Sequence, residues 1–330
     1  MNSRLYHSFL LFIFPLIAIT IIDCDKNKSP IASNDKSSGY IYAGTESGGI
    51  FRSVDNGKTW TDINKGLTDL KIYSLAFNTN GNIFAAASET LFRSMDYGNS
   101  WTNIVTGYSG HFRMIAINLV DNHIFAASSK GLLRSSNNGD TWELTGYAHD
   151  ADVIAINSTG HIFLGTELDG AFRSIDNGDT WSPINGDLEI RAIFSIGINP
   201  HNGDIFRMDW NGLFRSEDNG YSWSNVTSGI TQIVSSYTFN SSGHVYIGLW
   251  DYPPGDGDGG IFRSTDNCSS WIQINSGLNV SDIYDLSMNS SAHIFAGTGK
   301  GVFYSSNNGD NWTQIGLANY TIHSIKIYEK

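Results

Sequence analysis

Short runs of apolar, aromatic and β-branched residues recur along the chain, and Gly, Asn and Asp separate them. The pattern is clearest in one stretch, which contains four such runs: Ile72–Phe77, Asn82–Ala87, Leu91–Ser94 and Trp101–Ile104. Runs of this length between turn-forming residues are typical of β-strands. The sequence therefore predicts an all-β protein built from repeated four-stranded units.

A turn motif, Ser-x-Asp-x-Gly-x-x-Trp, joins the third and fourth strands of each unit. Four copies are complete, two carry Asn in place of Asp, and one carries Cys268 in place of Gly. Asp and Asn accept hydrogen bonds within their own turn, and Gly supplies a positive φ without steric cost. The turn at Cys268 is therefore expected to be strained or rearranged. The motif tryptophans are Trp60, Trp101, Trp142, Trp181, Trp223, Trp271 and Trp312.

The motif tryptophans recur every 39 to 48 residues, a period that is typical of a β-propeller when each unit has four strands. The first copy begins at Tyr40–Thr45 and lacks its innermost strand, whereas Thr321–Ile327 is an innermost strand without a unit. Pairing the two would leave no open sheet edge. We predict a seven-bladed β-propeller with four-stranded antiparallel blades, closed by pairing of the N- and C-terminal segments.

The motif resembles the Asp-box, or BNR, repeat of the sialidase-like β-propeller superfamily, and the resemblance covers residues 39–330. In size and layout the chain is similar to photosystem II stability and assembly factor propellers, which bind a protein partner without catalysis. It also resembles xyloglucanase-type propellers, which need two carboxylates across a cleft, and sortilin-type propellers. The Arg-Ile-Pro motif of sialidases is missing. The resemblance implies the fold and leaves the activity open.

The first 38 residues have the pattern of an export signal followed by a tether. Arg4 precedes an uncharged run, Phe9–Ile22, which is shorter than the roughly 20 residues of a membrane span and fits a signal peptide over residues 1–23. The polar tether, residues 24–38, begins with Cys24. This layout resembles a bacterial lipoprotein lipidated at Cys24, although Asp23 departs from the expected small residue. Secretion without lipid and an uncleaved anchor are the alternatives.

Charge and cysteine content narrow the possible partners. The net charge is −12, from 32 acidic and 20 basic residues, which disfavours nucleic acid because that partner needs a basic surface. Cys24 and Cys268 are the only cysteines and cannot form a disulfide framework. We expect a monomer that is exported to the bacterial cell envelope or secreted, and that reaches a membrane only through its N-terminal anchor.

Residues that interrupt the repeat are the candidates for binding, because function concentrates on the variable loops of a rigid scaffold. Two tryptophans and three arginines of the predicted propeller lie outside the motif. We interpret them as an aromatic platform with anion contacts at the channel mouth, beside two carboxylates. The alternative is that both tryptophans pack across adjacent blades. The predicted ligand-binding residues are Arg113, Arg191, Arg207, Asp209, Trp210, Trp250, Asp251 and Tyr252.

No metal or cofactor is predicted. Asp251, Asp256 and Asp258 could supply oxygen ligands to calcium, but they match no full calcium-loop pattern. The recurring histidines before the second strand are expected to be turn residues rather than metal ligands; they are His123, His161, His244 and His293.

The function predicted from the sequence is non-catalytic binding of a protein or glycan at the channel mouth. The alternative is a glycoside hydrolase of sialidase-like or xyloglucanase-like type. Several acidic residues fall in loops on the mouth side, so a catalytic pair can be neither named nor excluded: Glu46, Glu89, Glu167, Asp169, Asp209 and Asp251.

Overall fold

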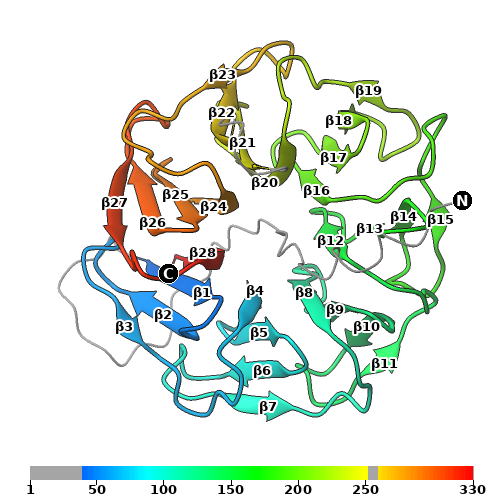
Figure 1. Ribbon diagram of the computed structural model, residues 1–330. Helices are drawn as coiled ribbons and strands as arrows, with labels where there is room; N and C mark the ends of the chain where they lie inside the picture. Colours follow the sequence, from blue (N-terminus) through cyan, green and yellow to red (C-terminus); the bar gives the residue numbers. More distant parts are fainter. Residues whose placement is uncertain (1–38, 252–258, 330) are drawn as a thin grey trace, which may run out of the picture.

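A ring of seven four-stranded antiparallel sheets makes up the protein (Figure 1). The computed structural model describes residues 39–251 and 259–329, and all the regular elements in these ranges are strands. Among these residues, no helix is long and apolar enough to cross a membrane. The predicted seven-bladed β-propeller is confirmed.

Each blade contributes its first strand to the ring axis and its last strand to the circumference (Figure 1). Blade 1 comprises β28 (Ile322–Tyr328), β1 (Tyr40–Thr45), β2 (Ile50–Ser53) and β3 (Thr61–Asp62). Blade 2 comprises β4 (Ile72–Phe77), β5 (Ile83–Ala87), β6 (Leu91–Ser94) and β7 (Thr102–Ile104). Blade 3 comprises β8 (Phe112–Ile117), β9 (Ile124–Ser128), β10 (Gly131–Ser135) and β11 (Glu143–Leu144).

The remaining four blades follow in chain order. Blade 4 comprises β12 (Val153–Ile156), β13 (Ile162–Gly165), β14 (Ala171–Ser174) and β15 (Ser182–Pro183). Blade 5 comprises β16 (Ser195–Ile198), β17 (Ile205–Asp209), β18 (Gly212–Ser216) and β19 (Ser224–Asn225). Blade 6 comprises β20 (Ile233–Phe239), β21 (Val245–Trp250), β22 (Gly260–Ser264) and β23 (Ile272–Gln273). Blade 7 comprises β24 (Ile283–Met288), β25 (Ile294–Thr298), β26 (Gly301–Ser305) and β27 (Thr313–Gly316).

The two chain ends close the ring as predicted. β1 pairs with β28 in antiparallel register, from Tyr40 opposite Tyr328 to Thr45 opposite Ile322. A buried ion pair ties β28 to blade 7, because Lys326 Nζ lies 3.0 Å from Asp285 Oδ2. The same carboxylate accepts the Ile325 N–H at 2.8 Å. The closing strand is therefore held by both of its neighbours.

The repeated turn motif joins blades as well as strands. In every copy, the Ser hydroxyl accepts the N–H of the Gly position at 2.8 or 2.9 Å. Five of the motif tryptophans donate Nε1–H to a carbonyl of the preceding blade, as Trp101 does to Ile63 at 2.7 Å. Motif arginines reach the next blade, as Arg93 does to the Asn138 carbonyl. These repeated side chains are used within the scaffold.

The turn at Cys268 keeps the geometry of its relatives. Its N–H still donates to Ser264 at 2.9 Å, and its φ of 67° is close to the left-handed region used by the other copies. The expected rearrangement is absent. The strain remains, because a residue with a Cβ is held where Gly is favoured.

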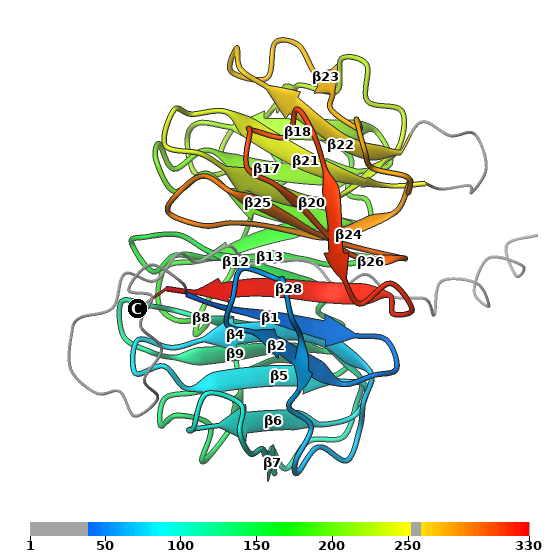
Figure 2. The same cartoon turned by 90° about the vertical axis from the view of Figure 1, so that its left-hand side faces the viewer.

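Alternation of strand direction sorts the connections onto two faces (Figure 2). Turns after the first and third strands of a blade, including the Asp-box turns, lie on one face, which we call the box face. Connections after the second and fourth strands lie on the other, the mouth face. The histidines expected in box-face turns are there: His161 and His244 donate their backbone N–H to Asn157 and Asn240 at 2.9 Å.

Candidate functional site

A ring of bulged residues surrounds the axis on the mouth face. In five blades the register of the innermost strand against the next strand shifts by one residue near its mouth-face end. In blades 4 and 5 the equivalent residue directly precedes the first paired residue. β-Bulges re-aim side chains and are frequent beside functional sites. We call this set the mouth ring: Tyr73, Arg113, Asp152, Phe194, Ser235, Tyr284 and His323.

The mouth ring is aromatic and charged where blades 7, 1 and 2 meet. The His323 ring lies 5.3 Å from the Tyr284 ring and 5.8 Å from the Tyr73 ring, measured between centroids. Glu46, from the turn after β1, places Oε2 3.2 Å from His323 Nε2, and its Oε1 lies 2.9 Å from Lys71 Nζ. Contacts with His323 and Lys71 lower the pKa of Glu46 to about 2, against the opposing effect of burial. Glu46 is therefore a carboxylate at neutral pH.

An ion-pair cluster occupies the mouth ring at blades 3 and 4. Arg113 Nη1 lies 2.7 Å from Asp152 Oδ1 and also contacts Asp150. Burial raises the pKa of Asp152 to about 6 despite the attraction of Arg113, and the nearby Asp150 and Glu167 carboxylates reinforce the shift. Asp152, the carboxyl of the mouth ring, is therefore easier to protonate near neutral pH than an ordinary aspartate.

Blades 5 and 6 give the mouth ring an apolar section. Phe194 is buried, and Trp210 stands edge-on against it with ring centroids 4.5 Å apart. Ser235 in blade 6 donates its hydroxyl to the Ile283 carbonyl of blade 7. The ring therefore changes in character from aromatic and charged, through an ion-pair cluster, to apolar.

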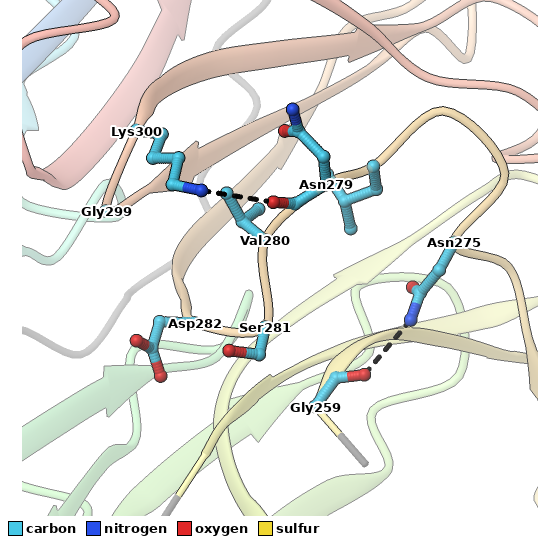
Figure 3. Close-up of a pocket in the computed structure, with 9 residues that line it drawn as sticks. Gly259, Asn275, Asn279, Val280, Ser281, Asp282, Gly299 and Lys300 are labelled. Atoms are coloured by element: carbon cyan, nitrogen blue, oxygen red, sulfur yellow. Dashed lines mark hydrogen bonds between the residues drawn. The ribbon is translucent and has the colours of Figure 1, made fainter. Parts of the chain in front are cut away.

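A hollow of about 500 Å³ lies on the mouth face between blades 6 and 7 (Figure 3). It is lined by Gly259, Asn275, the segment from Leu278 to Asp282, and the turn at Gly299–Lys300. Lys300 Nζ approaches the Asn279 carbonyl at 3.5 Å. Burial raises the pKa of Asp282, whose Oδ1 accepts the Asp251 N–H at 3.1 Å. Burial, and to a smaller extent the Asp282 and Glu46 carboxylates, raises the pKa of Tyr284 to about 12.

The predicted arginines do not converge. Arg113 belongs to the mouth ring. Arg191 is on the surface, where it pairs with Glu189. Arg207 has a fully buried side chain that pairs with Asp209 at 2.8 Å, and its guanidinium lies 5.0 Å from the Trp223 ring. In this conformation both side chains are buried, and Arg207 also donates to Asn185 Oδ1, after β15 of blade 4, at 3.2 Å.

The two tryptophans of the predicted aromatic platform lie in different environments. Trp210 has 52% of its surface exposed, whereas Trp250 is half-buried against the apolar cluster shared by blades 5 and 6. Asp251 is buried beside Asp282. Four predicted residues lie outside the described residues: Cys24, Tyr252, Asp256 and Asp258. Within residues 39–251 and 259–329, no three His, Cys, Asp or Glu side chains are arranged to hold a metal ion.

Sequence reasoning identified only Arg113 among the residues of the mouth ring as a site residue. Tyr73, Phe194 and Tyr284 look like ordinary strand residues, since aromatic side chains are common in strands. A signal was nevertheless present. When the seven copies are aligned on their first strands, this position changes between aromatic, basic, acidic and hydroxyl residues, while the position before it stays apolar.

No family model and no curated protein matches the chain. Among solved structures, a GH74 xyloglucanase from Xanthomonas campestris matches with a TM-score of 0.72 and 16% identity, over 84% of this chain and 52% of that chain. This protein therefore spans about half the length of that enzyme. YCF48 bound to a D1 peptide matches with a TM-score of 0.60 and 16% identity, over 87% of this chain and 88% of that one.

An extracellular domain of a putative two-component system from B. thetaiotaomicron matches with a TM-score of 0.61 and 18% identity, over 78% of this chain and 37% of that chain. At these identities the likeness shows the propeller fold alone. Hydrolases, a peptide-bound protein and a sensor domain share that fold, so activity has to be argued from the site.

Proposed function

We propose that this protein is a non-catalytic binding propeller that recognises a protein or a glycan on its mouth face. One observation carries the proposal: equivalent positions at the mouth-face ends of the innermost strands, five of them bulged, place side chains of six kinds around one axis in an otherwise repetitive scaffold. The box face offers repeated side chains that are already bonded to neighbouring blades. Variation on a rigid frame is what a recognition surface requires.

The charge state of Glu46, which lies beside the mouth ring, favours a binding role over a proton-donating role for this residue. A glycosidase of the usual kind pairs a carboxyl that can donate a proton with a second carboxylate. Glu46 is held ionised by His323 and Lys71, so it is a poor proton donor at neutral pH. Tyr284, Glu46 and Lys71 are partly exposed and can contact a ligand, whereas Tyr73 and His323 are buried. A single propeller of similar extent, YCF48, carries a bound peptide, which supports a binding role.

We also propose export, with residues 1–23 as the signal peptide, residues 24–38 as the tether and Cys24 as the lipidated residue. Two of the similar structures, an extracellular sensor domain and a surface component of a secretion system, come from proteins outside the cytoplasm. Mass spectrometry of the mature N-terminus would test this proposal. A diacylglyceryl group on Cys24 is expected, and an unprocessed Met1 would contradict it.

A glycoside hydrolase is the second candidate, and Asp152 favours it. The pKa of Asp152 is raised to about 6, which is the range of a general acid, and Glu167 lies close enough to contribute to that shift. If the protein is a hydrolase, it should release fluorophore from sialosides or β-glucans, and Asp152→Asn should abolish turnover. Absence of turnover by the wild-type protein over the whole panel is the result that the binding proposal predicts.

Binding itself is tested by screening the wild-type protein on a glycan microarray and a displayed library of random peptides. The selected ligand is then measured against the double variant Glu46→Gln/Tyr284→Ala. We expect affinity to fall at least about tenfold, as for contact residues at the centre of an interface. The matched control, Glu143→Gln/Tyr221→Ala, removes the same groups from the box face. Equal loss in both variants, or loss only in the control, would contradict the proposal.

A further inference from the structure

Three large apolar side chains are exposed on neighbouring mouth-face segments of blades 4 and 5. Leu168, in the turn after β13, is 76% exposed; Ile190, in the connection to blade 5, is 63% exposed; and Trp210, after β17, is 52% exposed. Single exposed apolar residues are ordinary, whereas a group of them marks an interaction site. We call this group the blade 4–5 rim.

Hydrogen bonds hold the segments of the blade 4–5 rim side by side. Ile193 donates its N–H to the Thr166 carbonyl at 2.9 Å, which fixes the connection between the blades against the Leu168 turn. Ala171 donates its N–H to Asn185 Oδ1 at 2.9 Å, which fixes the start of the same connection. Phe194, directly after Ile193, carries Trp210 on its edge. These contacts tie the backbone segments of the rim to one another before a ligand binds.

Carboxylates dominate the surroundings of the blade 4–5 rim. The mouth-face turns of blades 3 to 5 carry six carboxyl groups, two guanidinium groups and one ammonium group, so their sum is negative. Tyr147 fixes the position of Asp169 by donating to its Oδ2 at 3.2 Å. A surface of this kind attracts cationic groups and repels phosphate and other carboxylates. The groups counted are Asp150, Asp152, Glu167, Asp169, Asp187, Glu189, Arg113, Arg191 and Lys130.

We propose that the blade 4–5 rim binds a polypeptide segment in which large apolar side chains are flanked by lysine or arginine. The inference rests on the proposed binding function and specifies its partner. Leu168 and Ile190 offer aliphatic contact rather than flat stacking surfaces, which suits apolar side chains better than sugar rings. The surrounding carboxylates complement basic residues, and they oppose acidic glycans, nucleic acid and anionic lipid.

The test is selection of random short peptides on the immobilised wild-type protein. Selected peptides should combine an apolar residue with Lys or Arg, and their affinity should fall at least about tenfold in Leu168→Ser/Ile190→Ser/Trp210→Ser. The matched control, Val54→Ser/Met95→Ser/Ile175→Ser, removes similarly exposed apolar side chains from the box face and should stay within about twofold.

The contribution of the surrounding carboxylates to peptide binding is tested separately with the double variant Glu167→Gln/Glu189→Gln. This variant should weaken peptide binding at about 50 mM salt and much less at about 500 mM, where exposed charges are screened. The control for this variant is Glu143→Gln/Glu217→Gln on the box face. Affinity that is independent of both salt and the Glu167→Gln/Glu189→Gln change would overturn the proposed partner chemistry.

The outcomes separate this inference from the proposed function. Peptides that survive the triple rim substitution but are lost in Glu46→Gln/Tyr284→Ala would overturn the rim as the site and leave mouth-face binding intact. Peptides lost only in the box-face controls would overturn both. Failure to select any peptide, with binding on the glycan microarray, would overturn the polypeptide partner alone.

Discussion

At the scale of single residues, the Asp-box turn of blade 6 keeps the left-handed backbone conformation of the other copies, although Cys268 occupies the position of Gly. Cys268 is buried and keeps a φ of 67°, and burial raises the pKa of its thiol to about 12. The hydrogen bond to Ser264 and the fit of the turn against blade 5 over-determine the conformation, so the residue with a Cβ is forced into it.

Two substitutions of Cys268 distinguish the cost of its backbone strain from the contribution of its buried sulfur to stability. Cys268→Ala keeps the Cβ in the left-handed region and loses the buried sulfur, whereas Cys268→Gly loses both the sulfur and the strain. We expect the glycine variant to be more stable than the alanine variant by about 1 kcal/mol. Urea unfolding of the two variants measures this difference, and a more stable alanine variant would show that the turn is unstrained.

The roles of repeated residues could be predicted from the sequence, but the burial of Arg207 and Asp209 could not. The turn residues act within a few positions of themselves, so a short motif contains their geometry. Arg207 and Asp209 stand two apart on β17, a strand whose five residues are all buried. Only the packing of neighbouring blades decides that both faces of this strand are covered, and two opposite charges placed there must pair.

At the scale of elements, the Asp-box turns differ in whether their central residue carries charge. Hydrogen bonds from Ser222 lower the pKa of Asp218, and those from Ser270 lower the pKa of Asp266 to about 2. In blade 3, Asn137 accepts the equivalent N–H from Thr141 at 2.9 Å without a charge. The turn therefore needs the oxygen acceptor, and the charge adds a dependence on pH.

The two carboxylates should make stability sensitive to acid. Because their folded-state pKa values are lowered, their contribution is complete above the unfolded pKa of about 4 and is lost as pH falls toward about 2. Asp218→Asn/Asp266→Asn keeps the acceptors, so its stability should fall less over this range. Urea midpoints measured across the range test this expectation. Parallel pH profiles for the variant and the wild type would contradict it.

The bulges that make the mouth ring could not be predicted from the sequence. A bulge is a mismatch of register between two strands, and the apolar pattern of either strand alone does not contain it. The pairing of β4 with β5 includes Ile72, Ser74 and Leu75 but skips Tyr73, which is the bulged residue. The four-stranded units themselves were predicted closely, because their turns and apolar runs are local features.

At the scale of the whole molecule, a buried ion pair reinforces the closure that the pairing of β1 with β28 provides. The Lys326 ammonium and the Asp285 carboxylate link β28 to β24 across the join between the chain ends and the rest of the ring. Burial raises the pKa of Asp285 to about 6, although Lys326 opposes this effect. The sequence predicted closure from its incomplete first and last units, but it gave no sign of the ion pair.

Removing one partner of the Lys326–Asp285 ion pair should lower the stability of the folded protein. Lys326→Met leaves Asp285 buried without its cation, and we expect a loss of about 3–5 kcal/mol at neutral pH. The variant should raise the pKa of Asp285 further, so the loss should shrink as pH falls below that value and the carboxyl becomes neutral. Asp285→Asn/Lys326→Met keeps an acceptor for Ile325 and should recover most of the stability. Thermal unfolding that is equal in the single and double variants would contradict this account.

The central claim is that the mouth face is the recognition surface. Hydrogen–deuterium exchange of the wild-type protein, with and without a ligand from the screens described above, tests it most directly. The account predicts slower exchange in the mouth-face segments 46–49, 71–73, 166–170 and 282–284 when the ligand is bound. Protection confined to box-face turns such as 53–60 and 216–223, with the mouth-face segments unchanged, would contradict it.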